Sequence, residues 1–110
     1  MIQEITNNID KIIEACREFR LQSLYVFGSA ARESDFTPKS DIDFLVTFKT
    51  NPLLENIDEL SLYFESIDKL SNKFSNILKR DIDLLIEKNI KNKYLLESIN
   101  SEKKIIYAEA

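Results

Sequence analysis

Apolar residues near the start of the chain recur at the three-to-four-residue spacing of an amphipathic helix. They predict a helix from about residue 2 to 20. A second run of the same kind follows the sequence TNP (50–52) and predicts a long helix that ends near residue 79. A third, shorter helix is predicted near residues 91–99. The apolar positions of the two main helices are Ile2, Ile5, Ile9, Ile12, Ile13, Cys16 and Phe19, then Leu54, Ile57, Leu60, Phe64, Ile67, Leu70, Phe74 and Ile77.

Alternating or β-branched segments between these helices predict strands. Two of them are short and partly aromatic, SLYVFG (23–28) and KKIIYA (103–108). The other two, DIDFLVTF (41–48) and RDIDLLIE (80–87), each contain an alternating DID followed by apolar residues, so as strands they place their aspartates on one face and their isoleucines on the other. This order of elements predicts an α/β (α+β) fold in which helices pack on a small mixed β-sheet.

Length and charge narrow the classes of function. A chain of 110 residues is expected to form one domain, 1–110, with room for a hydrophobic core. The formal net charge of -4 argues against a nucleic-acid partner, which would favour a basic face. No apolar run approaches the ~20 residues of a membrane-spanning helix, and no signal-peptide pattern is present. We therefore expect a cytoplasmic protein without membrane contact.

Cysteine and histidine limit the available chemistry. Cys16 is the only cysteine, and its place on the apolar side of the first helix predicts a buried thiol. The chain has no histidine, which excludes a histidine general base, Ser-His and Cys-His pairs and His-containing zinc sites. Carboxylates remain as the main candidates, and they suit hard cations such as Mg²⁺.

Asp41 and Asp43 are two residues apart on a predicted strand, so both carboxylates point to one face. Asp81 or Asp83, on the second strand of this form, would supply a third carboxylate. Carboxylates gathered this closely repel one another, and one or two Mg²⁺ ions would relieve the repulsion and attract a triphosphate. Taken alone, either DID segment is better explained as the solvated face of a strand. The combination with the turn before them favours a site.

That turn contains the only glycine of the chain, Gly28, followed by Ser29. Glycine lets the backbone approach a ligand closely, and Ser29 can begin a helical turn in the segment GSAARE (28–33). The free amides of such a turn favour anions. We therefore expect the glycine turn to hold phosphates and the acids to hold the metal.

At these residues the chain resembles the minimal nucleotidyltransferase (MNT) domain of the DNA polymerase beta superfamily, of the MntA-like antitoxin type. The resemblance is carried by FGS, a polar loop, SDIDFLV and the later RDIDLL, and it covers about residues 22–108. It implies the small nucleotidyltransferase fold. It also implies in-line attack on the α-phosphate of an NTP, with ATP as the expected nucleotide and pyrophosphate as the leaving group.

The resemblance assigns roles to individual residues. Gly28, Ser29 and Arg32 would bind the nucleotide, and Asp41 and Asp43 would bind two Mg²⁺ ions. The third acid of the family precedes an apolar pair, which matches Asp83 in IDLL. Asp83 would also lie near the attacking hydroxyl and help to remove its proton. Same-face geometry alone does not separate Asp83 from Asp81, which stays the second choice.

The sequence departs from the family pattern in the segment after the first strand. Members often read Gly-Ser-Arg-Ala-Arg-Gly, whereas this chain has Ala30 at the first arginine, keeps Arg32 and has Glu33 at the final glycine. The spacing to Asp41 is also one residue longer than the commonest form. These changes affect the expected phosphate contacts and leave all three acids in place.

Stand-alone members of this type often act with a small helical HEPN-type partner. The resemblance therefore implies an antitoxin that adds AMP to a tyrosine of a HEPN toxin. Two alternatives stay open at this point. One is a binding protein of the same fold that neutralises its partner by contact, and the other is a small-molecule nucleotidyltransferase of the aminoglycoside type. The long second helix has enough apolar positions for a homodimer as well.

Overall fold

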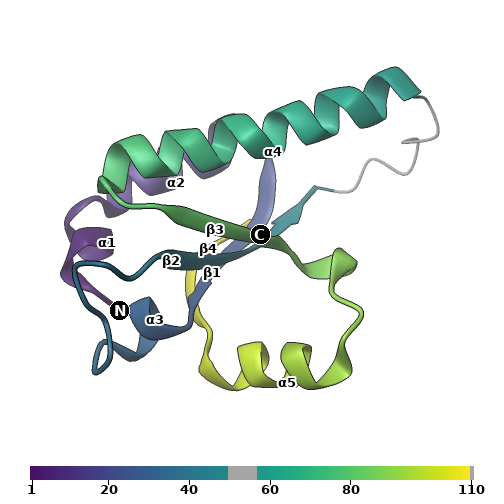
Figure 1. Cartoon of the computed structure of the whole chain (residues 1–110). Helices are drawn as coiled ribbons and strands as arrows, with labels where there is room; N and C mark the ends of the chain where they lie inside the picture. Colours follow the sequence, from purple (N-terminus) through teal and green to yellow (C-terminus); the bar gives the residue numbers. More distant parts are fainter. Residues whose placement is uncertain (50–56, 110) are drawn as a thin grey trace.

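A computed structural model describes residues 1–49 and 57–109, in which helices lie on both sides of a four-stranded sheet (Figure 1). The predicted α/β fold with a small mixed sheet is therefore confirmed. The elements are α1 (Gln3–Asn7), α2 (Ile9–Glu18), β1 (Leu21–Phe27), α3 (Ser29–Arg32), β2 (Ile42–Phe48), α4 (Ile57–Leu78), β3 (Ile82–Ile86), a 3₁₀ helix (Glu87–Asn89), α5 (Lys93–Glu102) and β4 (Lys104–Ala108).

The strand order β3-β2-β1-β4 places the two DID strands side by side. β1 runs antiparallel to both β2 and β4, whereas β2 and β3 run parallel. The parallel connection is made by α4, which packs across one face of the sheet (Figure 1). Because β2 and β3 run in the same direction, both DID segments open their strands at the same end of the sheet.

The main core lies between the sheet and the helices α2 and α4 (Figure 1). The alternation predicted for β2 is observed, since Ile42, Phe44 and Val46 are fully buried on this side. The Phe44 ring packs on Phe74 of α4, with ring centroids 5.0 Å apart. On the opposite face, where α5 lies, Leu45 is buried too, so β2 is covered on both sides along its middle.

The first predicted helix, from about residue 2 to 20, is interrupted in the structure. Asn8 leaves helical geometry, with φ -115° and ψ 18°, and separates α1 from α2. Its side-chain amide donates to the carbonyl oxygen of Glu4 at 2.8 Å. Asparagine competes in this way for backbone hydrogen bonds, a tendency that apolar periodicity does not register.

The remaining boundaries differ from the predictions by small shifts. β1 begins at Leu21 rather than residue 23, and α5 begins at Lys93 because the Asn92 side chain accepts hydrogen bonds from the first amides of the helix. The 3₁₀ helix at Glu87–Asn89 was not predicted. The predicted break at residues 50–52 and the start of the long helix at Leu54 lie outside the described residues.

The buried thiol predicted at Cys16 is confirmed. Cys16 has no exposed surface, and burial raises the pKa of its thiol to about 12. A thiol with this pKa stays protonated at neutral pH and is a poor nucleophile. In the part of the chain that is described, no helix is long and apolar enough to cross a membrane.

Candidate functional site

The two DID segments meet in register at the start of β2 and β3. Asp43 is the direct Cα partner of Asp83, and the neighbouring pair is Ile42 with Ile82. Partners in adjacent strands point to the same face of a sheet, so the two carboxylates lie side by side. This register favours Asp83 over Asp81 as the acid that accompanies Asp43.

The environment of Asp43 disfavours its ionised form. Partial burial is the main cause, followed by the negative charges of Asp83 and Asp41 and by hydrogen bonding to Asp83, and together these raise the pKa of Asp43 from 3.8 to about 6. The positive charge of Arg32 acts in the opposite direction. A carboxylate held close to two others in this way favours a bound cation.

The donor set fits a divalent metal ion by its chemistry. Asp41, Asp43 and Asp83 offer carboxylate oxygens, which are the ligands that Mg²⁺ prefers. Across residues 1–49 and 57–109, no three acidic or cysteine side chains converge closely enough to hold one ion in common. Asp43 and Asp83 are direct neighbours in register, whereas Asp41, an exposed residue just before β2, would have to turn toward them to complete a site.

Gly28 lies directly against Asp43. It follows Phe27, the last residue of β1 and the partner of Asp43, and it has φ +67°, a backbone conformation that residues with side chains rarely adopt. A Cβ atom at this position would stand 2.5 Å from Asp43 Oδ2. Both the backbone conformation and the close approach therefore require glycine, and the predicted turn is physically joined to the acids.

The predicted helical turn after Gly28 is observed as α3. The amides of Ala31 and Arg32 both donate to the carbonyl oxygen of Gly28 at 3.1 Å, and Glu33 donates to Ser29 at 2.8 Å. The amides of the first residues of a helix precede its first internal hydrogen bond and can face a ligand. The phosphate-binding role of Gly28 and Ser29 stays a prediction on this geometry.

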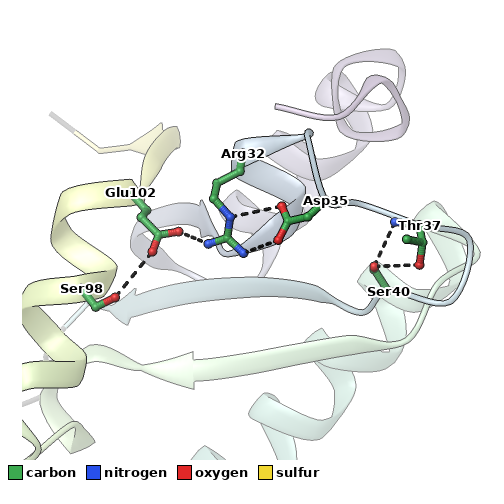
Figure 2. Close-up of polar contacts among 6 residues, drawn as sticks. All are labelled: Arg32, Asp35, Thr37, Ser40, Ser98 and Glu102. Carbon is green, nitrogen blue, oxygen red and sulfur yellow. Dashed lines mark hydrogen bonds and ion pairs between the residues drawn. The ribbon is translucent and has the colours of Figure 1, made fainter.

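Arg32 is held by two carboxylates that the sequence analysis did not identify (Figure 2). Its Nε and Nη2 donate to the two oxygens of Asp35 at 3.2 and 2.8 Å, and its Nη1 donates to Glu102 at the end of α5. These contacts hold the pKa of Arg32 above its ordinary value. The Asp35 contact is suggested by its three-residue spacing, whereas nothing in the sequence links Arg32 to Glu102.

Asp81 lies in a cleft beside the paired acids. The cleft has a volume of about 450 Å³ and is lined by Lys39, Asp41, Lys79, Arg80 and Asp81, among others. Asp81 is exposed, and its carbonyl oxygen accepts a hydrogen bond from the Ile42 amide at 3.0 Å. Asp81 therefore lies in the cleft next to the candidate site, two residues before Asp83.

Comparison with known proteins identifies relatives over nearly the whole chain. The family model for polymerase beta nucleotidyltransferases matches residues 10–110. Two proteins of Methanocaldococcus jannaschii, both named as candidate protein adenylyltransferases, are 35% and 36% identical over 106 residues. Each alignment covers 96% of this chain and 93% of the relative.

Solved structures share the fold. A minimal nucleotidyltransferase structure superposes with a TM-score of 0.69 at 21% identity, covering 91% of this chain and 90% of its own. A toxin–antitoxin structure with AMP-PNP superposes with a TM-score of 0.66 at 24% identity, and the match covers 93% of this chain and 74% of that chain. The structure of a tri-AMPylated Shewanella oneidensis HEPN toxin in complex with MNT antitoxin gives a TM-score of 0.61 at 22% identity. The match covers 94% of this chain and 72% of that chain.

Proposed function

Since the chain belongs to the polymerase beta nucleotidyltransferase family, we propose that it transfers AMP from ATP to a hydroxyl of a partner protein. The observation that carries this proposal is the packing of Gly28 against Asp43, which is itself paired with Asp83. A glycine turn for phosphates and a carboxylate pair are thereby brought into contact at one point of the sheet.

In this proposal Asp41, Asp43 and Asp83 hold Mg²⁺. When bound, the metal offsets negative charge on the reacting phosphate and on the leaving pyrophosphate. Burial and the charges of Asp83 and Asp41 raise the pKa of Asp43, and this supports the assignment because a nearby cation would stabilise the ionised carboxylate. Two ions are expected from the family, and Asp41 and Asp43 would hold them.

The reaction exchanges one phosphorus–oxygen bond for another. The acceptor hydroxyl oxygen bonds to the α-phosphorus, the bond from the α-phosphorus to the bridging oxygen breaks, and pyrophosphate leaves on the opposite side. Asp83 takes up the hydroxyl proton. Gly28 and Ser29 bind the phosphates through their backbone, and Arg32 reaches them by exchanging one of its two carboxylate partners.

The partner is proposed to be a HEPN-type helical protein, with this chain as the antitoxin in the cytoplasm. The support comes from the relatives named as candidate protein adenylyltransferases and from the fold shared with MNT antitoxins in HEPN complexes. On this reading the domain of residues 1–110 provides the nucleotide site, and the partner provides the hydroxyl.

One observation favours a second candidate, a binding protein that neutralises its partner by contact. Arg32 is the basic residue retained in the GSAARE segment, and it is already occupied by Asp35 and Glu102. If neither carboxylate releases it, the triphosphate loses its expected guanidinium contact. Binding of the partner would then be independent of the acids.

Transfer of label from ATP separates the two candidates. The protein is incubated with the product of the neighbouring gene, with ATP labelled at the α-phosphate and with Mg²⁺. The mixture is then resolved on a gel. We expect a labelled partner band that disappears in the Asp41→Ala/Asp43→Ala variant. The transferase would be contradicted if the partner stays unlabelled while the wild-type chain and the double variant bind it with equal affinity. That result would support neutralisation of the partner by contact.

A further inference from the structure

The cleft described above contains Asp41, one of the proposed metal ligands, and lies at the start of the two DID strands. In-line displacement puts the attacking oxygen opposite the leaving group. The glycine turn touches Asp43 from β1, on one side of β2, and the cleft lies at the starts of β2 and β3, on the other side. If pyrophosphate leaves over Gly28, the acceptor hydroxyl approaches from the cleft.

Two lysines give the cleft free positive charge. Lys39 and Lys79 line it, and neither ammonium group pairs with a carboxylate among the residues with described positions. Arg80, the third basic residue there, is already engaged with Glu4 at 3.4 Å and with the Thr37 carbonyl at 3.0 Å. The two lysines are therefore the cations available to a ligand in the cleft.

The loop that carries Lys39 is fixed by contacts with Arg80. Arg80 Nη1 donates to the carbonyl oxygens of Thr37 and Ser40, and its guanidinium stacks 4.6 Å from the ring centroid of Phe36. The Thr37 amide also donates to Ser40 Oγ at 3.0 Å, a contact visible in Figure 2. Lys39 thus stands on a loop whose backbone is tied at both ends.

The opposite wall is fixed by the end of α4. Lys79 adopts φ +57° just past the helix, and its amide donates to the Ser75 carbonyl at 2.8 Å. Ser75 Oγ donates in turn to the carbonyl oxygen of Arg80 at 2.8 Å. Both lysines therefore begin from defined backbone positions on facing walls, which lowers the ordering cost of binding a charged ligand.

We propose that this cleft docks the acceptor protein through an acidic segment next to the acceptor hydroxyl, with Lys39 and Lys79 pairing its carboxylates. The inference rests on the proposed transferase function and names the chemistry of its second substrate. The two lysines line the cleft together with Asp41, a proposed metal ligand, so an anionic segment paired with them would hold a neighbouring neutral hydroxyl near the acids of the site. A triphosphate lacks the neutral hydroxyl at that end and is assigned to the Gly28 side.

Binding of synthetic peptides tests the inference without requiring transfer. The probe is a fluorescein-labelled peptide with one tyrosine flanked by glutamates, and the reference is the same peptide with glutamines in their place. By fluorescence anisotropy, we expect the full chain to bind the glutamate peptide roughly tenfold more tightly. The Lys39→Gln/Lys79→Gln variant should lose this preference.

A matched control removes the same charge elsewhere. Lys91 and Lys93 are exposed and follow the far end of β3, so Lys91→Gln/Lys93→Gln should keep the preference for glutamate. Equal binding of the two peptides by the wild-type chain would overturn the inference. So would displacement of the glutamate peptide by ATP without Mg²⁺, because the cleft would then be a phosphate site.

Steady-state kinetics separate the docking role of the cleft from the transferase activity itself. With a partner that accepts label, Lys39→Gln/Lys79→Gln should raise the KM for the partner roughly tenfold and leave the KM for ATP unchanged. An unchanged KM for the partner would overturn the docking assignment and leave the transferase intact. Absence of label with every protein would count against the transferase, while the anisotropy result would still decide the charge preference of the cleft.

Discussion

The segments DIDFLV (41–46) and DIDLLI (81–86) are nearly the same in sequence and differ in their environment. The first opens a central strand, where Leu45 is buried on the second face and Asp43 is half-buried. The second opens β3, at the edge of the sheet, where Asp83 is exposed. Only Asp43 has a glycine backbone pressed against its carboxylate.

The comparison teaches that the place of a motif in the sheet decides its chemistry. Burial at a central strand makes the charge on Asp43 unfavourable, and a neighbouring strand brings a second carboxylate to it. The edge position leaves Asp83 accessible from the side of β3, where an acceptor hydroxyl can approach. The same three letters thus provide a half-buried carboxylate in the central strand and an exposed carboxylate, the proposed base, in the edge strand.

The largest effect is expected from removing the charge of Asp43. Asp43→Asn should lower nucleotidyl transfer by at least about 10³-fold, because it removes the proposed metal ligand that lies between Gly28 and Asp83. Transfer of α-phosphate label measures this loss. Asp68→Asn, which removes an exposed carboxylate from α4, serves as the control and should transfer at the wild-type rate.

Gly28→Ala should destabilise the fold by about 3 kcal/mol. The positive φ accounts for about 1 kcal/mol of this, and the remainder comes from the collision with Asp43 Oδ2. Urea denaturation measures the free energy of unfolding. The collision is tested by making Gly28→Ala in the Asp43→Ala variant, which lacks the carboxylate. There the substitution should lower the free energy of unfolding by only about 1 kcal/mol. An undiminished loss would refute the contact.

Addition of Mg²⁺ should stabilise the wild-type chain, and it should do so less when either member of the Asp43–Asp83 pair is replaced. At an ion concentration about tenfold above the dissociation constant, binding adds about 1.4 kcal/mol to the free energy of unfolding. Thermal denaturation with and without Mg²⁺ measures the gain. Asp43→Asn and Asp83→Asn should both reduce it, and a gain that persists in both variants would place the ion elsewhere.

Without divalent cations, Asp43 should make stability depend on pH. Its pKa is raised from 3.8 to about 6, so the folded state binds more protons in this interval and stability falls as the pH rises through it. The full shift is worth about 3 kcal/mol, and partial exposure reduces this to about 1 kcal/mol. Asp43→Asn should therefore be more stable than the wild type above pH 6, and the difference should vanish near pH 4.

The strands of the site could be predicted from sequence because their alternation is strong. A two-residue period predicts directly that Asp41 and Asp43 share one face and that the apolar residues between and after them lie on the other. The only glycine of the chain predicts the turn at Gly28. The Asn8 break was missed because it depends on one side chain that bonds its own backbone. Apolar spacing contains no information on such a local contact.

Contacts between distant segments could not be predicted. The choice between Asp81 and Asp83 requires the register of two parallel strands that α4 separates in sequence. The hold of Glu102 on Arg32 joins residues 70 positions apart, and the cleft forms only where α4 ends beside the loop before β2. These features depend on how the chain packs, which single-sequence patterns do not encode.

The most direct test of the central claim compares Asp83→Asn with Asp81→Asn. The two substitutions remove the same charge from one DID segment, and only the first removes the partner of Asp43. Label transfer from ATP to the partner protein should be lost in Asp83→Asn and should persist in Asp81→Asn. Loss in Asp81→Asn with persistence in Asp83→Asn would contradict the register on which the site is built.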